Sequence, residues 1–266
     1  MTADDDRIRR LEKTVTDIQN RFGLRVIGRA PRAAPSVIPT GFPDLDATLS
    51  GGLPRGRISE IVGVPTAGAT TLALKVASNA QAQDGAVVYI DVARTFDPDY
   101  AHRCGVDLHR LMLVHPYHMK QAITMLPDFA ASEGFDLLLF DMPLHPPLEL
   151  NQQQGLSSAL GRLLAPLNRS GGVLLFVTSL PPDGSLPPDG APPVNASSLD
   201  GYPHHLALPH YAALRLLIRR ARWLHRRQDV RGYEADVLVL KNRLGKADQE
   251  VRIAITFNGT VRGDGV

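Results

Sequence analysis

The segment from Gly63 to Thr71 combines residue types and a spacing that can bind phosphate. Its sequence, GVPTAGATT, lies between a strand-like and a helix-like run. In the phosphate-loop pattern G-x-x-x-x-G-K-[ST], backbone N–H groups and a lysine hold the phosphates, and the hydroxyl binds magnesium. Gly63, Gly68 and Thr70 occupy the expected positions, but Ala69 replaces the lysine. By itself the pattern leaves three alternatives: a nucleotide site, a site that has lost its nucleotide, or a loop that never bound one.

Strands and helices alternate on both sides of this loop. Predicted strands cover 58–62, 86–91, 111–114, 135–141 and 173–178, and predicted helices cover 70–81, 120–132 and 156–167. This alternation predicts an α/β fold with a mostly parallel, twisted sheet and helices on both faces. After residue 210 three strands follow without helices, at 214–218, 235–240 and 251–257. They predict an antiparallel extension of the sheet.

Residues 1–30 predict a separate helix and strand. Apolar residues recur at three- and four-residue spacing over 5–22, which is typical of an amphipathic helix. A short β-like piece follows at 24–27, and the Pro/Ala-rich segment 31–39 predicts a linker to a core domain at 40–266. The helix and strand are too small to fold alone. We therefore expect them to pack on their own core or on a neighbouring chain.

The composition excludes several classes of protein. The hydrophobic fraction of 44% and the charged fraction of 21% are ordinary for a globular protein. No apolar run reaches the roughly 18 to 20 residues that a bilayer span requires, and the N-terminus MTADDDRIRR has no apolar signal segment. The single cysteine, Cys104, excludes an intrachain disulfide and agrees with a reducing compartment. We therefore expect a cytoplasmic protein without a membrane partner.

Arginines cluster in one segment near the C-terminus, where Asp229 is the only acid. They are Arg215, Arg219, Arg220, Arg222, Arg226, Arg227 and Arg231. Such clustering is typical of proteins with a polyanion partner. The alternative is a solvated hairpin with arginines on its exposed face.

The region that joins the parallel and antiparallel halves is rich in proline. The hexapeptide SLPPDG occurs twice, at 179–184 and 185–190, and its prolines and glycines preclude a helix or a central strand. A long loop of this kind is either disordered or functional. His204, His205 and His210 follow it without a cysteine or carboxylate at ligand spacing, so we expect no metal site there.

Several stretches together resemble the bacterial RecA recombinase family. They are TGFPDLD at 40–46, GGLPRGRISEI at 51–61, the phosphate loop, YID at 89–91, FDPDYA at 96–101, CGVD at 104–107, FDLLLFD at 135–141 and LKNR at 240–243. The resemblance covers nearly the whole chain except 142–213. It implies a RecA-like P-loop NTPase core without the family's separate C-terminal domain. It also implies that residues 1–30 are an oligomerisation arm that packs on the next subunit of a filament.

Three chemical positions of the family carry side chains that cannot do its chemistry. The resemblance places the phosphate-loop lysine at Ala69, the water-activating glutamate at Ala93 and the γ-phosphate-sensing glutamine at Ser179. Phosphoryl transfer depends on positioning and charge stabilisation. Their joint loss therefore predicts impaired or absent ATP hydrolysis.

Other family positions are kept, and the resemblance implies that they contact ATP and magnesium. They are Gly63, Gly68, Thr70, Thr71, Asp97, Tyr100, Asp141, Lys241 and Arg243. Thr70 and Asp141 would hold magnesium, and Tyr100 would stack on the adenine. Asp97 would contact the base, and Lys241 and Arg243 would reach a neighbour's phosphates. The alternative is that Asp97 and Tyr100 are turn and packing residues, and that Lys241 and Arg243 are a solvated strand end.

The resemblance also implies DNA binding, but with altered loops. Two loops of the family hold single-stranded DNA, and here the corresponding segments, 144–155 and the SLPPDG loop, carry no lysine or arginine. The candidate DNA-binding residues are instead Arg219, Arg220, Arg222, Trp223, Arg226 and Arg227. An aromatic residue among arginines suits base stacking combined with phosphate neutralisation.

The sequence thus predicts a RecA-like factor in DNA repair or recombination that binds DNA or RecA-like subunits, either its own copies or a true recombinase, with little or no ATP hydrolysis. One alternative is an adaptor in translesion synthesis, like the RecA-like ImuA proteins. Another is an unconventional DNA-dependent ATPase that takes a lysine from elsewhere, such as Lys75 or a neighbour's Lys241. A third is a structural protein that binds neither nucleotide nor DNA.

Overall fold

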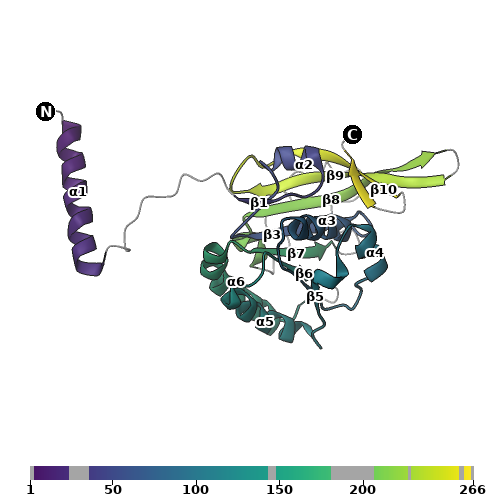
Figure 1. Ribbon diagram of the computed structural model, residues 1–266, viewed down its shortest axis with the longest axis horizontal. Coiled ribbons are helices and arrows are strands. Elements are labelled where there is room, and N and C mark those ends of the chain that lie inside the picture. The colour runs from purple at the N-terminus through teal and green to yellow at the C-terminus, as the bar shows by residue number, and fades with distance from the viewer. Residues whose placement is uncertain are drawn as a thin grey trace. The chain divides into compact units, whose positions relative to one another are not determined.

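The computed structural model describes residues 3–23, 36–142, 148–180, 207–226, 229–257 and 261–264 (Figure 1). The chain divides into two units, residues 1–34 and 35–266. Val37 and Ile38 form strand β1 (Val37–Ile38), which pairs with β2 (Leu53–Pro54). These two residues fall within the predicted linker, yet they belong to the second unit because they make strand hydrogen bonds there.

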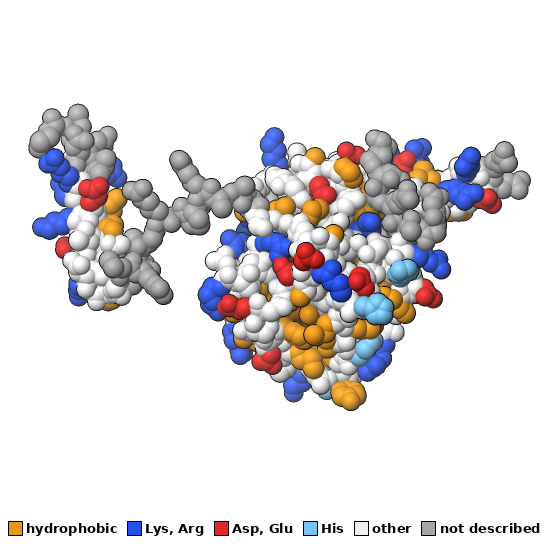
Figure 2. Space-filling view, viewed as in Figure 1, with side chains coloured by type: hydrophobic (Ala, Val, Ile, Leu, Met, Phe, Trp, Pro, Cys, Tyr) orange, Lys and Arg blue, Asp and Glu red, His pale blue; other side chains and the backbone are white. Residues whose placement is uncertain are grey.

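The first unit contains the helix α1 (Ala3–Phe22), close to the predicted range 5–22. Gly23 follows it with a φ of +98°, and its N–H donates to the Gln19 carbonyl, as is common at the end of a helix. Leu11 and Phe22 are each 64% exposed, and hydrophobic side chains gather along one side of this helix (Figure 2). The strand predicted at 24–27 lies outside the described residues.

Apart from the β1–β2 pair, the described strands of the second unit form one mixed sheet of nine strands in the order β11-β10-β9-β8-β3-β7-β6-β4-β5 (Figure 1). They are β3 (Ile58–Gly63), β4 (Val87–Asp91), β5 (Leu111–Val114), β6 (Leu137–Asp141), β7 (Val173–Ser179), β8 (Leu214–Arg226), β9 (Asp229–Asn242), β10 (Glu250–Phe257) and β11 (Val261–Asp264). Neighbours from β5 to β8 pair in parallel, and those from β8 to β11 pair antiparallel. This confirms the predicted α/β class with its antiparallel extension.

Helices cover both faces of the parallel part of the sheet. One apolar core includes residues of α2 (Pro43–Thr48), α3 (Ala69–Ala82) and α4 (Pro98–Arg103), which the short η1 (Leu108–Arg110) follows. The other includes residues of α5 (Met119–Ser132), α6 (Leu150–Ser170) and α8 (Leu208–Tyr211). Leu139 of β6 belongs to the first core and Phe140 to the second, so this strand is buried on both faces. Among the described helices, none combines the length and apolar character that crossing a bilayer requires.

A fully buried ion pair joins β8 to the central strand β3. Arg215 Nε donates to the Glu60 carboxylate at 2.6 Å, and the Thr178 hydroxyl of β7 donates to the same carboxylate at 3.0 Å. Arg215 and Glu60 are both 0% exposed. A buried charge requires a paired partner, so loss of either residue alone would leave an unpaired charge in the core. Although Arg215 belongs to the arginine cluster of the sequence, it does not contribute to a basic surface.

Two segments differ from the prediction. α6 begins at Leu150, so the second half of the expected loop 144–155 is helical; the Gln152 side chain accepts the Glu149 N–H at 3.0 Å and closes the first turn. β8 and β9 are also longer than the predicted strands 214–218 and 235–240. Their outer parts are held by cross-strand polar and aromatic pairs, which a search for apolar runs does not detect.

Candidate nucleotide-binding site

A cavity of about 470 Å³ lies at the carboxyl ends of the central parallel strands. Its lining consists of the β3–α3 loop 63–71, residues that end or follow β4, β6 and β7, and the aromatic residues Tyr100 and Tyr233. In open α/β sheets this edge is where ligands bind. The predicted site residues are therefore expected to line this cavity.

The loop 63–71 requires glycine at both ends. A Cβ on Gly63 would lie 2.6 Å from the Ala69 Cβ, and a Cβ on Gly68 would lie 2.5 Å from the Tyr233 hydroxyl. Gly68 also has a φ of +101°, and α3 begins at the next residue. The first N–H groups of a helix have no partner within the helix, and such groups attract anions. The loop and the start of α3 therefore have a geometry that suits phosphate.

The three positions at which the resemblance places the family's chemical side chains all line this cavity. They are Ala69, Ala93 and Ser179. Among the described lining residues, Asp141 carries the only carboxylate, and none carries a lysine or arginine side chain.

Asp141 ends β6 and receives a hydrogen bond from Tyr89. The Tyr89 hydroxyl donates to Asp141 Oδ2 at 2.7 Å. Burial raises the pKa of Asp141, the Tyr89 hydrogen bond lowers it, and the nearby Asp91 raises it. Thr70 lines the same cavity. A hydroxyl and a carboxylate are suitable magnesium ligands in a phosphate loop. The residues therefore fit a magnesium-bound phosphate, although sequence analysis gave Tyr89 no role.

Tyr100 lines the cavity, whereas Asp97 does not. The Tyr100 hydroxyl lies 2.6 Å from Thr71 Oγ1, and burial raises its pKa to about 12. The Asp97 side chain accepts the Tyr100 N–H at 3.0 Å and caps α4. Asp97 therefore has the contact of a helix cap, while Tyr100 both packs on the core and faces the cavity.

Lys241 and Arg243 lie outside the cavity lining. Lys241 Nζ donates to the Pro209 carbonyl at 2.7 Å, and Arg243 Nη2 donates to the His210 carbonyl at 3.0 Å. Both carbonyls belong to the short helix α8. For either residue to reach a neighbour's phosphates, it would have to exchange these carbonyl partners.

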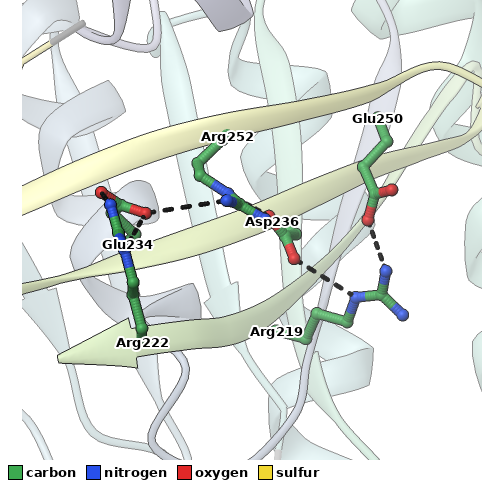
Figure 3. Close-up of polar contacts among 6 residues, drawn as sticks. All are labelled: Arg219, Arg222, Glu234, Asp236, Glu250 and Arg252. Atoms are coloured by element: carbon green, nitrogen blue, oxygen red, sulfur yellow. Dashed lines mark hydrogen bonds and ion pairs between the residues drawn. The ribbon is translucent and has the colours of Figure 1, made fainter. Parts of the chain in front are cut away.

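The arginine cluster is largely paired with acids from the neighbouring strands (Figure 3). The network comprises Arg219, Arg222, Glu234, Asp236, Glu250 and Arg252. Arg222 donates to both Glu234 oxygens, at 2.7 and 2.8 Å, and Arg219 pairs with Asp236 and Glu250. The acids come from β9 and β10, so the local sequence did not reveal them.

Arg220 and Trp223 lie on the other face of β8, and a bulge between them places Trp223 on the same face as Arg220. Arg220 is opposite Ala235 and Trp223 is opposite Tyr233, which leaves Ala221 as the extra residue. The Trp223 and Tyr233 rings are 5.7 Å apart in an edge-to-face arrangement. Sequence analysis missed Tyr233, since it lies beyond the predicted strand 235–240.

DNA binding by the cluster remains a prediction. Arg226 is exposed at the end of β8, and Trp223 is 45% exposed. Arg227 lies outside the described residues. Since Arg219 and Arg222 are paired with carboxylates, the contribution of these two to a polyanion interface is reduced.

A parallel sheet, a glycine loop that leads from its central strand into a helix, and an acid at the end of β6 define the P-loop NTPase fold. The chain matches the RecA N-terminal domain over residues 9–262. It is 32% identical to Protein RecA of Nocardia farcinica over 276 residues, which are 98% of this chain and 77% of that protein. It is 31% identical to Protein RecA of Acidothermus cellulolyticus over 281 residues, which are 100% of this chain and 79% of that protein. The chain belongs to the RecA family.

Proposed function

We propose that this protein is a RecA-family factor of DNA recombination or repair that binds a nucleotide but hydrolyses it slowly or not at all. Family membership supports the role in recombination and repair. One observation carries the finer proposal: a single cavity keeps the phosphate loop with Thr70 and Asp141, while Ala69, Ala93 and Ser179 occupy the chemical positions.

ATP with magnesium is the ligand that suits these residues. The N–H groups of the loop would hold the phosphates, Thr70 and Asp141 would hold magnesium, and Tyr100 would contact the base. Bound magnesium would neutralise part of the phosphate charge. Without the lysine and the water-activating acid, little remains to stabilise the charge that develops during phosphoryl transfer.

Calorimetric titration with ATP tests the binding half of this proposal. We expect measurable affinity when magnesium is present, and a loss of about tenfold or more in Asp141→Asn, since a charged oxygen ligand is removed. In EDTA the two proteins should bind ATP equally. Asp128→Asn on the exposed side of α5 is the matched control. Absence of binding at millimolar Mg-ATP would show that the nucleotide half of the proposal is wrong.

We also propose that residues 1–30 dock on a RecA-like neighbour, either a second copy or a true recombinase. The exposed apolar side chains of α1, including Leu11 and Phe22, are what such a contact would bury. Deleting residues 1–30 should give a smaller sedimenting species while the core unit stays folded. An unchanged species across a wide concentration range would contradict this docking.

A further inference from the structure

The phosphate loop has an arginine beside it, although Ala69 replaces its own lysine. Arg220 Nη1 donates to the Thr66 hydroxyl at 3.1 Å and to the Thr66 carbonyl at 3.5 Å. Thr66 belongs to the loop and lines the cavity. A guanidinium from β8 therefore lies at the rim of a cavity that has no cation among its described lining residues.

Arg220 differs from its neighbours in charge balance. Arg219, Arg222 and Arg252 each pair with at least one carboxylate. Within the described ranges, no carboxylate pairs with Arg220, and its Nε and Nη2 make no hydrogen bond. A guanidinium carries a planar set of donors that fits phosphate oxygens. Arg220 thus keeps both its charge and part of its donor set for a ligand.

Aromatic residues hold this guanidinium near the loop. It lies 4.5 Å from the centroid of the Trp223 ring, in a cation–π arrangement. Trp223 packs on Tyr233, which itself lines the cavity. Burial raises the pKa of Tyr233, while the Thr71 hydrogen bond and the Arg220 charge oppose that rise. The guanidinium is therefore close enough to act on a group at the cavity wall.

We propose that Arg220 supplies the positive charge that the loop lacks at Ala69, so that the cavity binds a polyphosphate chain with the help of one arginine from β8. This inference rests on the proposed function and names the residue that replaces the lysine. Arg220 shares its face with Ile218 by regular alternation, and the Ala221 bulge turns Trp223 to the same face and Arg222 to the other.

The test compares Arg220→Gln with Arg252→Gln. Each substitution removes one positive charge from the antiparallel extension, and the acids that Arg252 contacts keep Arg222 and Arg219 as partners. Calorimetry measures the affinity for Mg-ATP and for inorganic triphosphate. We expect Arg220→Gln to weaken both by roughly tenfold to a hundredfold, and Arg220→Lys by less. Arg252→Gln should keep the parent affinities, and thermal melting should show all variants folded.

Two further measurements separate a local charge effect from a loss of structure. Ala69→Lys in the Arg220→Gln background should restore most of the affinity, because it returns a cation to the loop. Trp223 is the only tryptophan of the chain. Its fluorescence should change when triphosphate is added to the parent and to Arg252→Gln, and should not respond in Arg220→Gln.

The outcomes distinguish this inference from the proposed function. Equal Mg-ATP affinities for the parent and Arg220→Gln would overturn the inference and leave nucleotide binding intact. Arg220-dependent binding of triphosphate without binding of Mg-ATP would support the inference and contradict nucleotide binding. Binding of neither probe would overturn both. Weaker binding of single-stranded DNA with unchanged triphosphate affinity would assign Arg220 to DNA and also overturn the inference.

Discussion

The two faces of the β8–β9 hairpin use arginine in opposite ways. On one face, Arg219 and Arg222 pair with acids from β9 and β10, so the charges largely cancel (Figure 3). On the other face, Arg220 contacts an aromatic ring and the phosphate loop. The residue type is the same; ordinary alternation separates Arg219 from Arg220, and the Ala221 bulge separates Arg220 from Arg222. Charge in a short sequence segment therefore says little about surface charge until the strand register is known.

Inserting an alanine between Glu234 and Ala235 would give Ala221 a partner and remove the bulge, which should turn the outer part of the hairpin over and have the largest effect on stability. Regular alternation would turn Arg222 toward the aromatic face and Trp223 toward the ion pairs. Mispaired groups of this kind cost about 2 kcal/mol or more, which lowers the Tm of a domain of this size by roughly 4–8 °C. Thermal melting measures this decrease in Tm. Ala221→Ser, which keeps the register, is the control, and equal Tm values for the two variants would contradict this account of the bulge.

A smaller effect should follow from Glu234→Gln, which removes the acid shared by Arg222 and Arg252. The Arg222 hydrogen bond lowers the pKa of Glu234 below its ordinary value of 4.5. The stabilisation is therefore fully present above that pH and is lost as pH falls through the lowered pKa. We expect the variant to melt about 1–3 °C lower at pH 7, because the Arg222 and Arg252 side chains are exposed to solvent although Glu234 is buried.

The pH dependence of this decrease in Tm shows whether the ionised Glu234 carboxylate is responsible for it. The difference in Tm between the parent and Glu234→Gln should shrink steadily below pH 4.5. Asp128→Asn, an exposed acid of α5 outside the network, should show no such pH-dependent difference. A Tm difference that stays constant from pH 7 to pH 3 would mean that the pairing does not depend on the ionised carboxylate.

Much of the fold could be predicted from the sequence because the signals are local. Alternating strands and helices predicted the parallel sheet, and the glycine spacing predicted the loop 63–71. Contacts between distant strands could not be predicted in this way. The partner of Arg215 is Glu60, 155 positions away, and Tyr233 reaches the cavity only through a hairpin whose length depends on cross-strand pairs.

The candidate site residues divide in the same way, into those that local sequence spacing predicts and those that depend on contacts between distant segments. Thr70 and Asp141, whose positions follow from motif spacing, line the cavity together. Lys241 and Arg243 were assigned through the family's filament contacts, and within one chain they bind the carbonyls of α8. Contact with a neighbouring subunit would give these two residues other partners. Such a contact depends on whole surfaces of the folded protein, which a sequence motif does not describe.

Steady-state turnover of Mg-ATP, measured with and without single-stranded DNA, tests the central claim most directly. The claim is that the phosphate loop survives as a binding site while Ala69, Ala93 and Ser179 leave it without hydrolytic chemistry. We predict turnover far below about 1 per second, the low end of ordinary enzymes, in both conditions. A DNA-stimulated turnover at or above that rate, abolished by Asp141→Ala, would contradict the claim.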